Sequence, residues 1–445
     1  MKTAWRFVVA LAISCGCLAA QPALAQDWIR TGTGLGVEKA RVAVADFAPK
    51  SDAAKAHAAL FCNVVRADLD FSGIIEVVSK SYYPLEVPAV PADLKYKAWS
   101  DPPASAAMVA FGNLSETASD VRIEAWLYDV RNPAAPPVVG KVYRGDATDA
   151  QVRRFAHQFA DEIVSKLSGG VPGVASTQIA FVSNRTGPKE IWAMDYDGAN
   201  QHRVTSLHTI SLTPRWSPDA SAIAFTCYVP YRRVVTPQIC IYSLVTGKVL
   251  TFPRFSGSNS APVFSPDGTK IMFCSSMLGN PDLFVVEADG GHPKRITFGN
   301  GANTSPAWNP KTGQTVAFVS DRGGLPGLYM MDADGSNVVK LDLPDMGYVI
   351  DPSWAPNGQL LTFSWRRPSG NYDLYLMDVA SRQISELTRD TGRNERPSWA
   401  PDGRHIVFES TRSGSRQIWS MLADGSQARQ LTTQGDNESP NWSLR

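Results

Sequence analysis

An excess of charge of either sign is what this sequence most clearly lacks. Its 445 residues include 43 lysines and arginines against 42 aspartates and glutamates. A balance this close to zero excludes bulk electrostatic attraction to nucleic acid or to an anionic membrane surface. Because 44% of the residues are hydrophobic and 10% are aromatic, the chain can bury more than one core, which excludes a disordered protein.

Long apolar runs are absent after the first 25 residues, which excludes a membrane-embedded protein. Those first residues combine a basic start at Lys2 and Arg6, an apolar stretch from Phe7 to Ala20, and the small-residue site Ala23-Leu24-Ala25. This order is typical of a secretory signal peptide. We therefore expect residues 1–25 to be removed and the mature chain to be exported without a lipid anchor.

Cysteine is scarce. Two of the six cysteines lie in the predicted signal peptide, and the other four contain no Cys-x-x-Cys pair. Four cysteines are too few to build a disulfide scaffold in a chain of this length. Cys227 and Cys240 border two strand-like runs, so either a cross-strand disulfide or two buried free thiols would fit there.

Catalytic and cofactor-binding motifs are missing as well. There is no Gly-x-Ser-x-Gly elbow, no His-Glu-x-x-His, no Walker loop and no His/Cys pair at zinc spacing. The glycines of residues 32–36 have the wrong spacing for a dinucleotide fingerprint. The Asp-x-Asp-Gly segments at 195–198 and 332–335 lack the further ligands of a calcium loop, so we interpret them as hairpin turns. The six scattered histidines favour surface or capping roles. We predict no catalytic residue, no cofactor and no metal site.

Glycine, proline and tryptophan are abundant instead, with 34, 31 and 12 residues. Much of this excess lies in one phrase, Pro-x-Trp-x-Pro-Asp-Gly or a close variant, which occurs six times. Its aromatic residue recurs 43 to 48 residues apart, at Trp216, Phe264, Trp308, Trp354, Trp399 and Trp442. This period matches a four-stranded propeller blade. We expect the aromatic residues to pack between neighbouring blades rather than to bind a ligand.

The order of the runs around the phrase predicts how the propeller closes. Each phrase except the last is followed by two strand-like runs and a polar edge strand, with Asp-Gly turns that supply positive φ angles. The first runs, from Ile179, have no phrase before them, and the last phrase, from Pro440, has no runs after it. The sequence therefore predicts an all-β six-bladed propeller over residues 177–445, in which Pro440 to Ser443 completes the first blade.

Residues 37–168 lack the repeat and predict an α/β N-terminal domain with alternating strands and helices. One helix is predicted from Ala53 to Leu69 with Asp52 as its N-cap, and another from Asp149 to Leu167 capped by Asp146 or Thr148. Residues 169–176 are a predicted linker, and residues 26–36 a flexible N-terminal arm.

Six loops lead from an outer strand into the next inner strand, and such loops converge at one end of a propeller channel. Here they are polar and varied, which suits a protein partner as well as it suits plain solvated loops. The residues that could meet a partner are Arg254, Phe255, Asn303, Asp351, Asn394, Glu395, Arg396 and Glu438.

The signal peptide, the small α/β domain and six such repeats with Leu-Tyr-x-Met-Asp runs resemble the TolB family of the Tol-Pal envelope system. The resemblance covers nearly all of the mature chain. It implies a non-catalytic protein-binding component of the periplasm that supports outer-membrane integrity and envelope constriction at cell division. The implied partners are a Pal-like peptidoglycan-associated lipoprotein at the propeller mouth, TolA at the N-terminal arm, and other outer-membrane lipoproteins. No nucleic acid is implied, and the protein would be peripheral to the envelope.

The resemblance also implies site residues. The Pal-facing loops of the family correspond to Arg254, Ala261, Asn303 and Thr304, and the charged rim residues Glu395 and Arg396 are assigned to the same partner. The TolA-binding arm corresponds to Gln26, Asp27, Trp28, Ile29 and Arg30. Two rival functions are an exported propeller hydrolase or lyase with a channel site, in which substitution of Arg396 or Glu395 would abolish turnover, and a TolB-like propeller that binds another protein.

Overall fold

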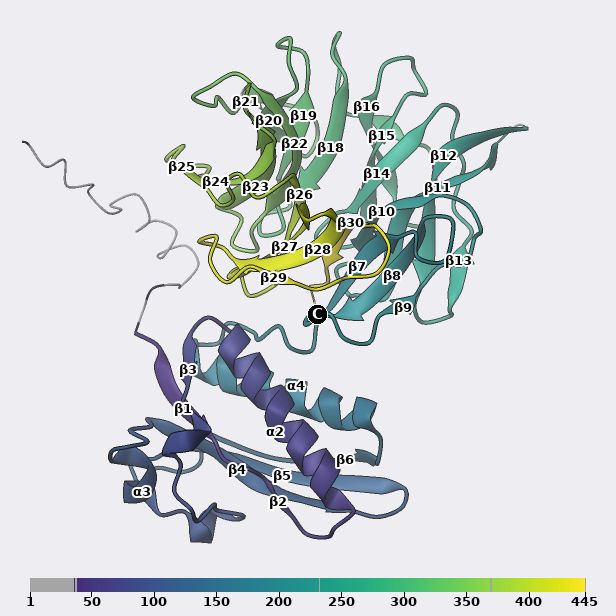
Figure 1. Cartoon of the computed structure of the whole chain (residues 1–445). Helices are drawn as coiled ribbons and strands as arrows, with labels where there is room; N and C mark the ends of the chain where they lie inside the picture. Colours follow the sequence, from purple (N-terminus) through teal and green to yellow (C-terminus); the bar gives the residue numbers. More distant parts are fainter. Residues whose placement is uncertain (1–35, 37, 232, 369, 445) are drawn as a thin grey trace, which may run out of the picture.

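A computed structural model describes residues 36, 38–231, 233–368 and 370–444. The predicted signal peptide, most of the predicted arm and the five residues assigned to TolA binding lie outside the described residues. An α/β domain is followed along the chain by a six-bladed β-propeller, which confirms the predicted fold class (Figure 1). No helix among the described residues is long and apolar enough to cross a membrane.

The α/β domain is built on one mixed sheet. β1 pairs in parallel with both of its neighbours, β3 and β4, and the remaining two strands continue antiparallel from β4. The short β2 also pairs with β4. In spatial order the strands are β3 (Ile75–Val77), β1 (Ala40–Val44), β4 (Met108–Glu116), β5 (Asp120–Asp129) and β6 (Val139–Asp146), with β2 at Ala48–Pro49.

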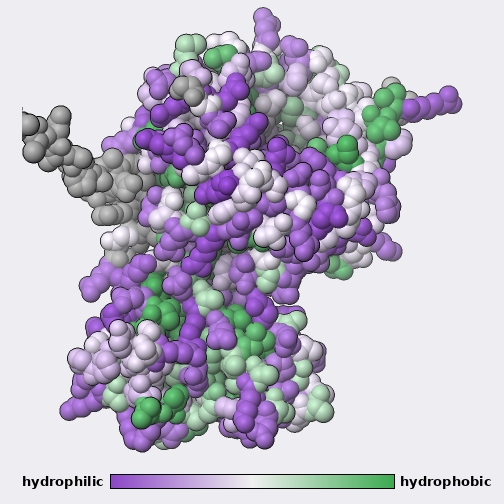
Figure 2. Space-filling view, viewed as in Figure 1, coloured by the Kyte–Doolittle hydropathy of each residue, from purple (hydrophilic) through white to green (hydrophobic). Residues whose placement is uncertain are grey.

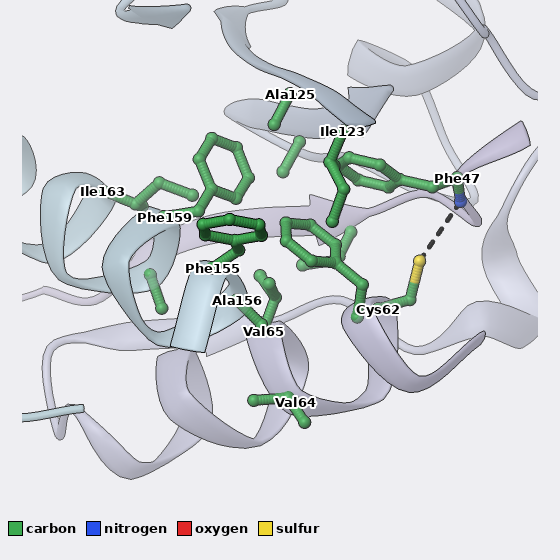
Figure 3. Packing of buried hydrophobic residues seen from close by; sticks show 14 of the residues in the cluster. Phe47, Cys62, Val64, Val65, Ile123, Ala125, Phe155, Ala156, Phe159 and Ile163 are labelled. Atoms are coloured by element: carbon green, nitrogen blue, oxygen red, sulfur yellow. Dashed lines mark hydrogen bonds between the residues drawn. The ribbon is translucent and has the colours of Figure 1, made fainter. Parts of the chain in front are cut away.

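Two long helices, α2 (Ala54–Phe71) and α4 (Asp149–Leu167), pack on one face of this sheet (Figure 1). Aromatic rings, among them Phe47 and Phe159, fill the layer between helices and sheet (Figure 3). The ring centroid of Phe61 lies 4.8 Å from that of Phe47 and 6.0 Å from that of Phe159. This packing follows from the apolar residues recurring at helical spacing along both helices. The core of this face is therefore formed by α2 and α4 together with the sheet.

The predicted helix caps have opposite outcomes. Thr148 caps α4 as predicted, because its hydroxyl accepts a hydrogen bond from the Gln151 N–H. The prediction that Asp52 caps α2 is wrong. The cap position is Ala53, which already has helical φ and ψ and makes no side-chain cap bond, while Asp52 pairs with Lys55 at 2.7 Å. The Asp52 carboxylate thus forms a surface ion pair instead of capping the helix.

Three short helices that the sequence did not predict cover the other face of the sheet. They have no periodic apolar pattern, yet they bring Tyr83 and Trp99 against Phe111 of β4. Trp99 is 1% exposed, so this face of the sheet is also buried. The elements are η2 (Lys80–Tyr82), η3 (Pro91–Asp93) and α3 (Tyr96–Ser100).

Each propeller blade is an antiparallel sheet of four strands whose first strand lines the centre of the ring. From the inner to the outer strand, the blades are as follows: blade 1, β30 (Asn437–Trp442), β7 (Gln178–Ser183), β8 (Glu190–Asp195), β9 (His202–Arg203); blade 2, β10 (Ser211–Trp216), β11 (Ala222–Tyr231), β12 (Val234–Ser243), β13 (Lys248–Leu250); blade 3, β14 (Asn259–Phe264), β15 (Lys270–Ser275), β16 (Asp282–Glu287), β17 (Lys294–Arg295); blade 4, β18 (Asn303–Trp308), β19 (Thr315–Ser320), β20 (Gly327–Asp332), β21 (Val339–Lys340); blade 5, β22 (Tyr348–Trp354), β23 (Leu360–Arg366), β24 (Tyr372–Asp378), β25 (Ile384–Glu386); blade 6, β26 (Asn394–Trp399), β27 (His405–Ser413), β28 (Ser415–Leu422), β29 (Arg429–Gln430).

The ring closes as predicted, because β30 pairs with β7 and completes blade 1. Trp442 is 2% exposed, and its indole N–H donates to the Thr177 hydroxyl at 2.7 Å. The Gln178 N–H donates to the Ser443 hydroxyl, and the Ser443 N–H returns a bond to the Gln178 carbonyl. The end of β30 is thus fastened to the start of β7.

The repeated phrase has the structural roles that the sequence predicted. The indole of Trp354 donates to the Ala307 carbonyl of the preceding blade, and Trp399 packs among residues of blades 5 and 6. The Asp-Gly turns adopt positive φ, with 95° at Gly335. A Cβ atom at Gly335 would lie 2.1 Å from the Ile296 carbonyl oxygen, so only glycine fits against the neighbouring blade.

The α/β domain contacts the propeller at the end where the Asp-Gly turns lie, beneath blades 1 and 6 (Figure 1). Three side chains meet in a buried cluster: Asp68 of α2 accepts hydrogen bonds from His157 of α4 at 2.8 Å and from the Tyr196 hydroxyl of blade 1 at 2.5 Å. Nearby, His405 stacks on Phe71 with centroids 4.2 Å apart and bonds to its carbonyl. We call these contacts the domain interface.

A disulfide joins Cys227 of β11 to Cys240 of β12, with their Cα atoms 5.9 Å apart. This answers the alternative that the sequence left open, while Cys62 and Cys274 are free and buried. Cys227 pairs across the strands with Gln238, so the bridge runs diagonally to Cys240.

Removal of this disulfide is expected to lower the free energy of unfolding. Closing a loop between positions 13 residues apart restricts the unfolded chain, an effect worth about 2–4 kcal/mol. The double variant Cys227→Ala/Cys240→Ala should therefore unfold at a lower urea concentration than the wild type, and dithiothreitol should have no effect on it. Cys274→Ala is the control, and it should keep the sensitivity of the wild type to reductant. Equal midpoints for wild type and double variant would contradict the expectation.

Candidate partner-binding site

Six residues with the same unusual backbone form a ring at the start of the inner strands. Each has φ between 50° and 54° and directly precedes the proline of the repeated phrase: Thr213, Ala261, Ser305, Asp351, Arg396 and Ser439. The register of the inner strand with its neighbour shifts at each of them, so each marks a β-bulge. We call the end of the channel that they surround the mouth.

The neighbouring blade holds several of these bulges in place. The Ala261 N–H donates to the Thr226 hydroxyl at 3.1 Å, and the Arg396 N–H donates to the Ser364 hydroxyl at 3.1 Å. Ser439 donates its N–H to the Glu409 carboxylate at 2.8 Å. In each case the acceptor lies on the second strand of the preceding blade, so hydrogen bonds link the ring across three of the six blade boundaries.

Four of the residues assigned to a Pal-like partner lie on this ring or next to it. Ala261 and Arg396 are ring residues, and Thr304 and Glu395 immediately precede ring residues. The expectation that they belong to loops is wrong, because β14, β18 and β26 already include them. Proline cannot donate a ladder hydrogen bond, so the sequence suggested a loop up to each proline. The bulge lets the strand continue across the proline instead.

Asn303, also assigned to the partner, is fully buried. Its amide N–H groups donate to Asp282 and to the Gly301 carbonyl, and its side-chain oxygen accepts from Arg322 at 2.7 Å. The same kind of network recurs in blade 6 around Asn394. In the free protein the Asn303 side chain therefore fastens its blade, and a direct contact with a partner would require this network to open.

An arginine clip fastens the hairpins at the mouth, and sequence reasoning missed it. In blade 4 the guanidinium of Arg322 lies over the Tyr329 ring, 5.3 Å from its centroid, while it donates to Asn303. Blades 1 and 6 repeat the arrangement with Arg185 and Arg412. The sequence does contain a signal for this clip, because Ser-x-Arg stands at the end of the second strand in all three blades.

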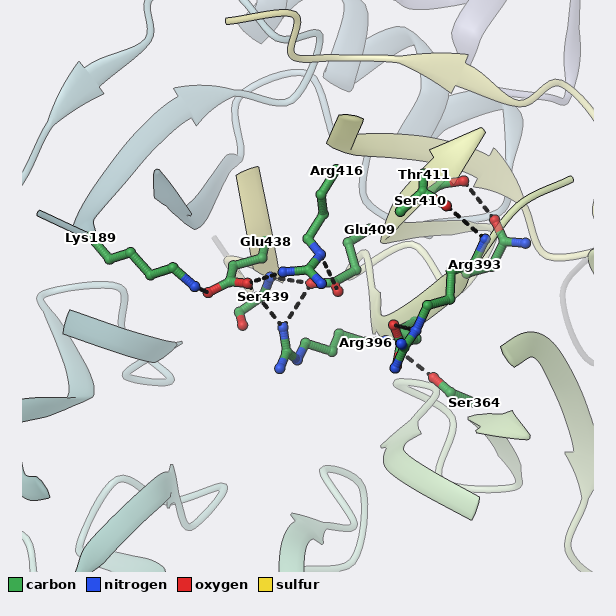
Figure 4. A network of polar contacts seen from close by, with 12 residues as sticks. Lys189, Ser364, Arg393, Arg396, Glu409, Ser410, Thr411, Arg416, Glu438 and Ser439 are labelled. Atoms are coloured by element: carbon green, nitrogen blue, oxygen red, sulfur yellow. Dashed lines mark hydrogen bonds and ion pairs between the residues drawn. The ribbon is translucent and has the colours of Figure 1, made fainter. Parts of the chain in front are cut away.

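A network of charged side chains lies on the rim of the mouth over blades 6 and 1 (Figure 4). Two of its carboxylates, Glu409 and Glu438, are only 2% and 7% exposed. Arg396 bonds Glu409 at 2.9 Å, Arg416 bonds Glu438 at 2.6 Å, and Lys189 bonds Glu438 at 2.5 Å. The three cations are 35% to 38% exposed. The carboxylates of the network are therefore buried, whereas its cations are partly exposed to solvent.

The electrostatics of the network follow from this arrangement. Burial raises the pKa of Glu409 despite its cationic neighbours. Burial also raises the pKa of Glu438, but Lys189 and Arg396 outweigh that effect, and the pKa is lowered overall. For Arg396, burial opposes the charged form, yet the charges of Glu409, Asp351 and Glu438 keep its pKa above the ordinary value. Arg396 therefore stays charged, and its guanidinium lies close to both Glu409 and Glu438.

Exposed apolar side chains are spread over the loops and hairpins at the same end of the propeller as the mouth. Most of the large exposed apolar residues of the propeller lie in the loops or hairpins at this end, on blades 2 to 5. They are Ile210, Val234, Val235, Leu278, Phe298, Leu325, Met346 and Tyr348. An apolar patch beside exposed cations is typical of a protein-binding surface.

The mouth residues assigned to catalysis by the rival interpretation are engaged in ion pairs. Glu395 receives a two-pronged contact from Arg393 at 2.6 and 2.9 Å, and Arg396 pairs with Glu409. The described residues contain no group of three or more His, Cys, Asp or Glu side chains that could hold a metal ion. What the mouth offers is a rigid frame with cationic and apolar side chains.

Comparisons with known proteins agree with this architecture. The description "TolB beta propeller domain" matches residues 164–348 and 344–445, and "TolB amino-terminal domain" matches residues 33–135. Among curated relatives, the Tol-Pal system protein TolB of Anaeromyxobacter dehalogenans is 35% identical over 67% of each chain. A TolB homolog of Chlorobium chlorochromatii is 31% identical over 58% of this chain and 56% of its own length, so this alignment spans little more than half of that relative. A crystal structure of TolB from Acinetobacter baumannii is 26% identical, with a TM-score of 0.76 over 91% of this chain and 97% of that one.

Proposed function

The chain belongs to the TolB family, and from this premise we propose that it is a non-catalytic, periplasmic component of a Tol-Pal system. Its curated relatives carry the name Tol-Pal system protein TolB. We propose that a Pal-like lipoprotein binds at the mouth and that TolA binds the N-terminal arm through residues 26–30. Through these contacts the protein supports outer-membrane integrity and envelope constriction at cell division.

The observation that carries the proposal for the mouth is the combination of exposed cations and exposed apolar groups on a rigid frame. Arg396 and Arg416 are held by buried carboxylates, so little side-chain entropy is lost when they meet an acidic partner. The exposed apolar residues on blades 2 to 5 offer apolar surface that a bound partner would bury. Both features lie at the end of the propeller opposite the domain interface.

The two proposed binding sites lie on different parts of the chain, and the domain interface offers one route between the α/β domain and the mouth. The Asp68 cluster and the His405 contact join the α/β domain to blades 1 and 6. Blade 6 and blade 1 also carry the charged network of the mouth. We propose that occupation of one site changes the availability of the other by way of these two blades.

The substitution Ala261→Trp is expected to weaken binding of a Pal-like partner at least tenfold. Ala261 is a half-buried ring residue with φ of 52°, and the equivalent position in blade 6 carries the long side chain of Arg396 at φ of 54°, so a large side chain at position 261 is compatible with the bulge and would obstruct the mouth. Affinity for the purified soluble domain of the Pal-like lipoprotein, measured by isothermal titration calorimetry, tests this.

The matched control is Ala261→Ser, which keeps the small side chain and should bind as the wild type does. Both variants should melt within a few degrees of the wild type. Undiminished affinity of Ala261→Trp would place the partner elsewhere on the molecule, and absence of binding by the wild type would refute the proposed partner.

A further inference from the structure

The hairpin formed by β11 and β12 is longer than its counterparts. Each of its strands has ten residues, whereas β15 and β16 of blade 3 have six. β10 pairs with β11 only as far as Cys227, and β13 pairs with β12 only from Ile241 to Ser243. Beyond Tyr228 the described strand residues of the hairpin pair only with each other, so its end projects from blade 2 (Figure 1).

The base of this hairpin is fastened differently from the others. Blade 2 has Cys227 where blades 1, 4 and 6 have the serine of Ser-x-Arg, and Val229 where they have the arginine. The arginine clip is therefore absent, and the Cys227–Cys240 disulfide joins the two strands at their base. Arg254, assigned to a Pal-like partner, donates to the Pro230 carbonyl and braces the hairpin from the side. A projecting element is thus anchored firmly at one end.

The projecting part exposes apolar groups that none of the described residues covers. Val234 and Val235 are each 61% exposed. Because they are consecutive in a strand, they point to opposite faces of the hairpin, so no single packing surface could bury both. Figure 2 shows apolar residues near the projecting tip at the upper right, with hydrophilic residues beyond them. Such an exposed apolar element marks an interaction site.

The segment of the chain that contains the hairpin carries basic residues and no acidic ones. Residues 220–266 contain no aspartate or glutamate but four basic residues, Arg232, Arg233, Lys248 and Arg254, although the chain as a whole is close to neutral. Arg233 and Arg254 are exposed in the described structure. A partner of opposite charge would be attracted to this side of the mouth, and the attraction would weaken as salt is added.

The hairpin is continuous with the mouth. It connects the second and third strands of blade 2, and such connections lie at the same end as the ring residues. Thr226 of β11 accepts the hydrogen bond of the ring residue Ala261 of β14, so the first strand of the hairpin is bonded directly to the ring. A partner seated in the mouth would therefore reach the hairpin with its flank.

We infer that the β11–β12 hairpin is a docking arm that contacts the flank of the protein bound at the mouth, at an acidic surface with an apolar centre. The inference rests on the proposed function, because it assumes a protein partner at the mouth. The valine on the face turned towards the partner would enter the apolar centre, and Arg233 would pair with the surrounding carboxylates. The disulfide and Arg254 would keep the arm oriented before binding, which lowers the entropy that binding must overcome.

A triple variant tests the docking arm: Val234→Ser, Val235→Ser and Arg233→Asn. Asparagine tolerates the positive φ of 71° at position 233, and all three side chains are exposed, so the melting temperature should stay within a few degrees of the wild type. The probe is the soluble domain of the Pal-like lipoprotein, titrated calorimetrically at 50 and 200 mM salt. We expect the triple variant to bind at least tenfold more weakly at 50 mM salt and to lose part of the salt dependence.

The matched control is Val338→Ser/Val339→Ser, which changes two exposed valines, 38% and 44% exposed, at the opposite end of blade 4. It should bind within twofold of the wild type. Equal affinity of the triple variant and the wild type would overturn the docking arm while leaving the proposed function intact. Absence of binding by the wild type would overturn both. Co-sedimentation with phosphatidylglycerol-containing vesicles that only the triple variant loses, with protein binding unchanged, would show a membrane contact instead and would also overturn it.

Discussion

A chain that ends at Pro440 is expected to lose the cooperative fold of its propeller. The truncation removes Trp442, which is 2% exposed, and loss of a buried tryptophan costs about 3–5 kcal/mol. It also removes the hydrogen bonds of Ser443 with Gln178 and of the indole with Thr177, each worth about 1 kcal/mol. The total of about 5–7 kcal/mol lies in the lower part of the range of stabilities of ordinary domains, about 5–15 kcal/mol. The shortened protein should therefore melt at least ten degrees lower or fail to fold when followed by circular dichroism.

The control truncation ends at Ser443. It keeps β30 complete, together with both groups that fasten it to β7, and removes Leu444, which is 42% exposed. This shorter truncation should melt within a few degrees of the full chain. If both truncated proteins melted like the full chain, the pairing of β30 with β7 would contribute little to the stability of the propeller.

The second large effect is expected at the domain interface, from Asp68→Ala. Asp68 is 5% exposed and accepts hydrogen bonds from His157 and Tyr196, which are 5% and 1% exposed. Its removal leaves two buried polar groups without their partner, a change that costs about 3–5 kcal/mol. The control is Asp70→Ala on the same helix, whose exposed carboxylate pairs with Arg429 at 3.0 Å. An exposed pair contributes about 0–1 kcal/mol, so urea unfolding should separate the two variants clearly.

The same cluster predicts a pH dependence. Burial by itself lowers the pKa of His157, but the hydrogen bond and charge of Asp68 outweigh it and raise the pKa overall. Burial raises the pKa of Asp68 as well, so the folded pair binds more protons than the unfolded chain. The contribution of His157 is complete below its unfolded pKa of about 6.5 and is lost as the pH rises through the raised value.

The difference in stability between wild type and Asp68→Ala should therefore narrow from pH 6 towards pH 9. Urea unfolding at a series of pH values measures it. A difference that stayed constant, or that widened with pH, would mean that His157 does not titrate with Asp68 in the folded protein. Asp70→Ala should show little change over the same range.

The blades could be predicted from the sequence because their signals are local and repeated. The repeated phrase predicted the length of a blade, and the Asp-Gly turns predicted the hairpins within it. The first runs, at Ile179, lack a phrase before them and the last phrase, at Pro440, lacks runs after it, which predicted that the two ends of the propeller pair. The helix Asp149–Leu167 was predicted for a similar reason, since its signals are the cap residue Thr148 directly before it and the apolar spacing within it. Asp52 shows the limit of such signals, because a nearby lysine competed for its carboxylate.

The site could be predicted only in part, because it depends on contacts between distant residues. The position of each phrase indicated where the mouth lies, and Ala261 and Arg396 are ring residues as a result. The sequence could not show that a bulge carries the strand through each proline, nor that Asn303 is bonded to Asp282 and Arg322. Likewise, the pairing of Arg396 with Glu409 depends on how two strands of blade 6 lie beside each other.

Closure by β30 also has a consequence for the order of events during synthesis. The residues that fasten the ring are separated by 265 positions, so β7 stays without its inner neighbour until almost the whole propeller has been made. Contacts this distant in sequence form slowly, because the intervening chain must first be brought together. If the chain is exported as we propose, the propeller would therefore stay open until its last strand has also crossed the membrane.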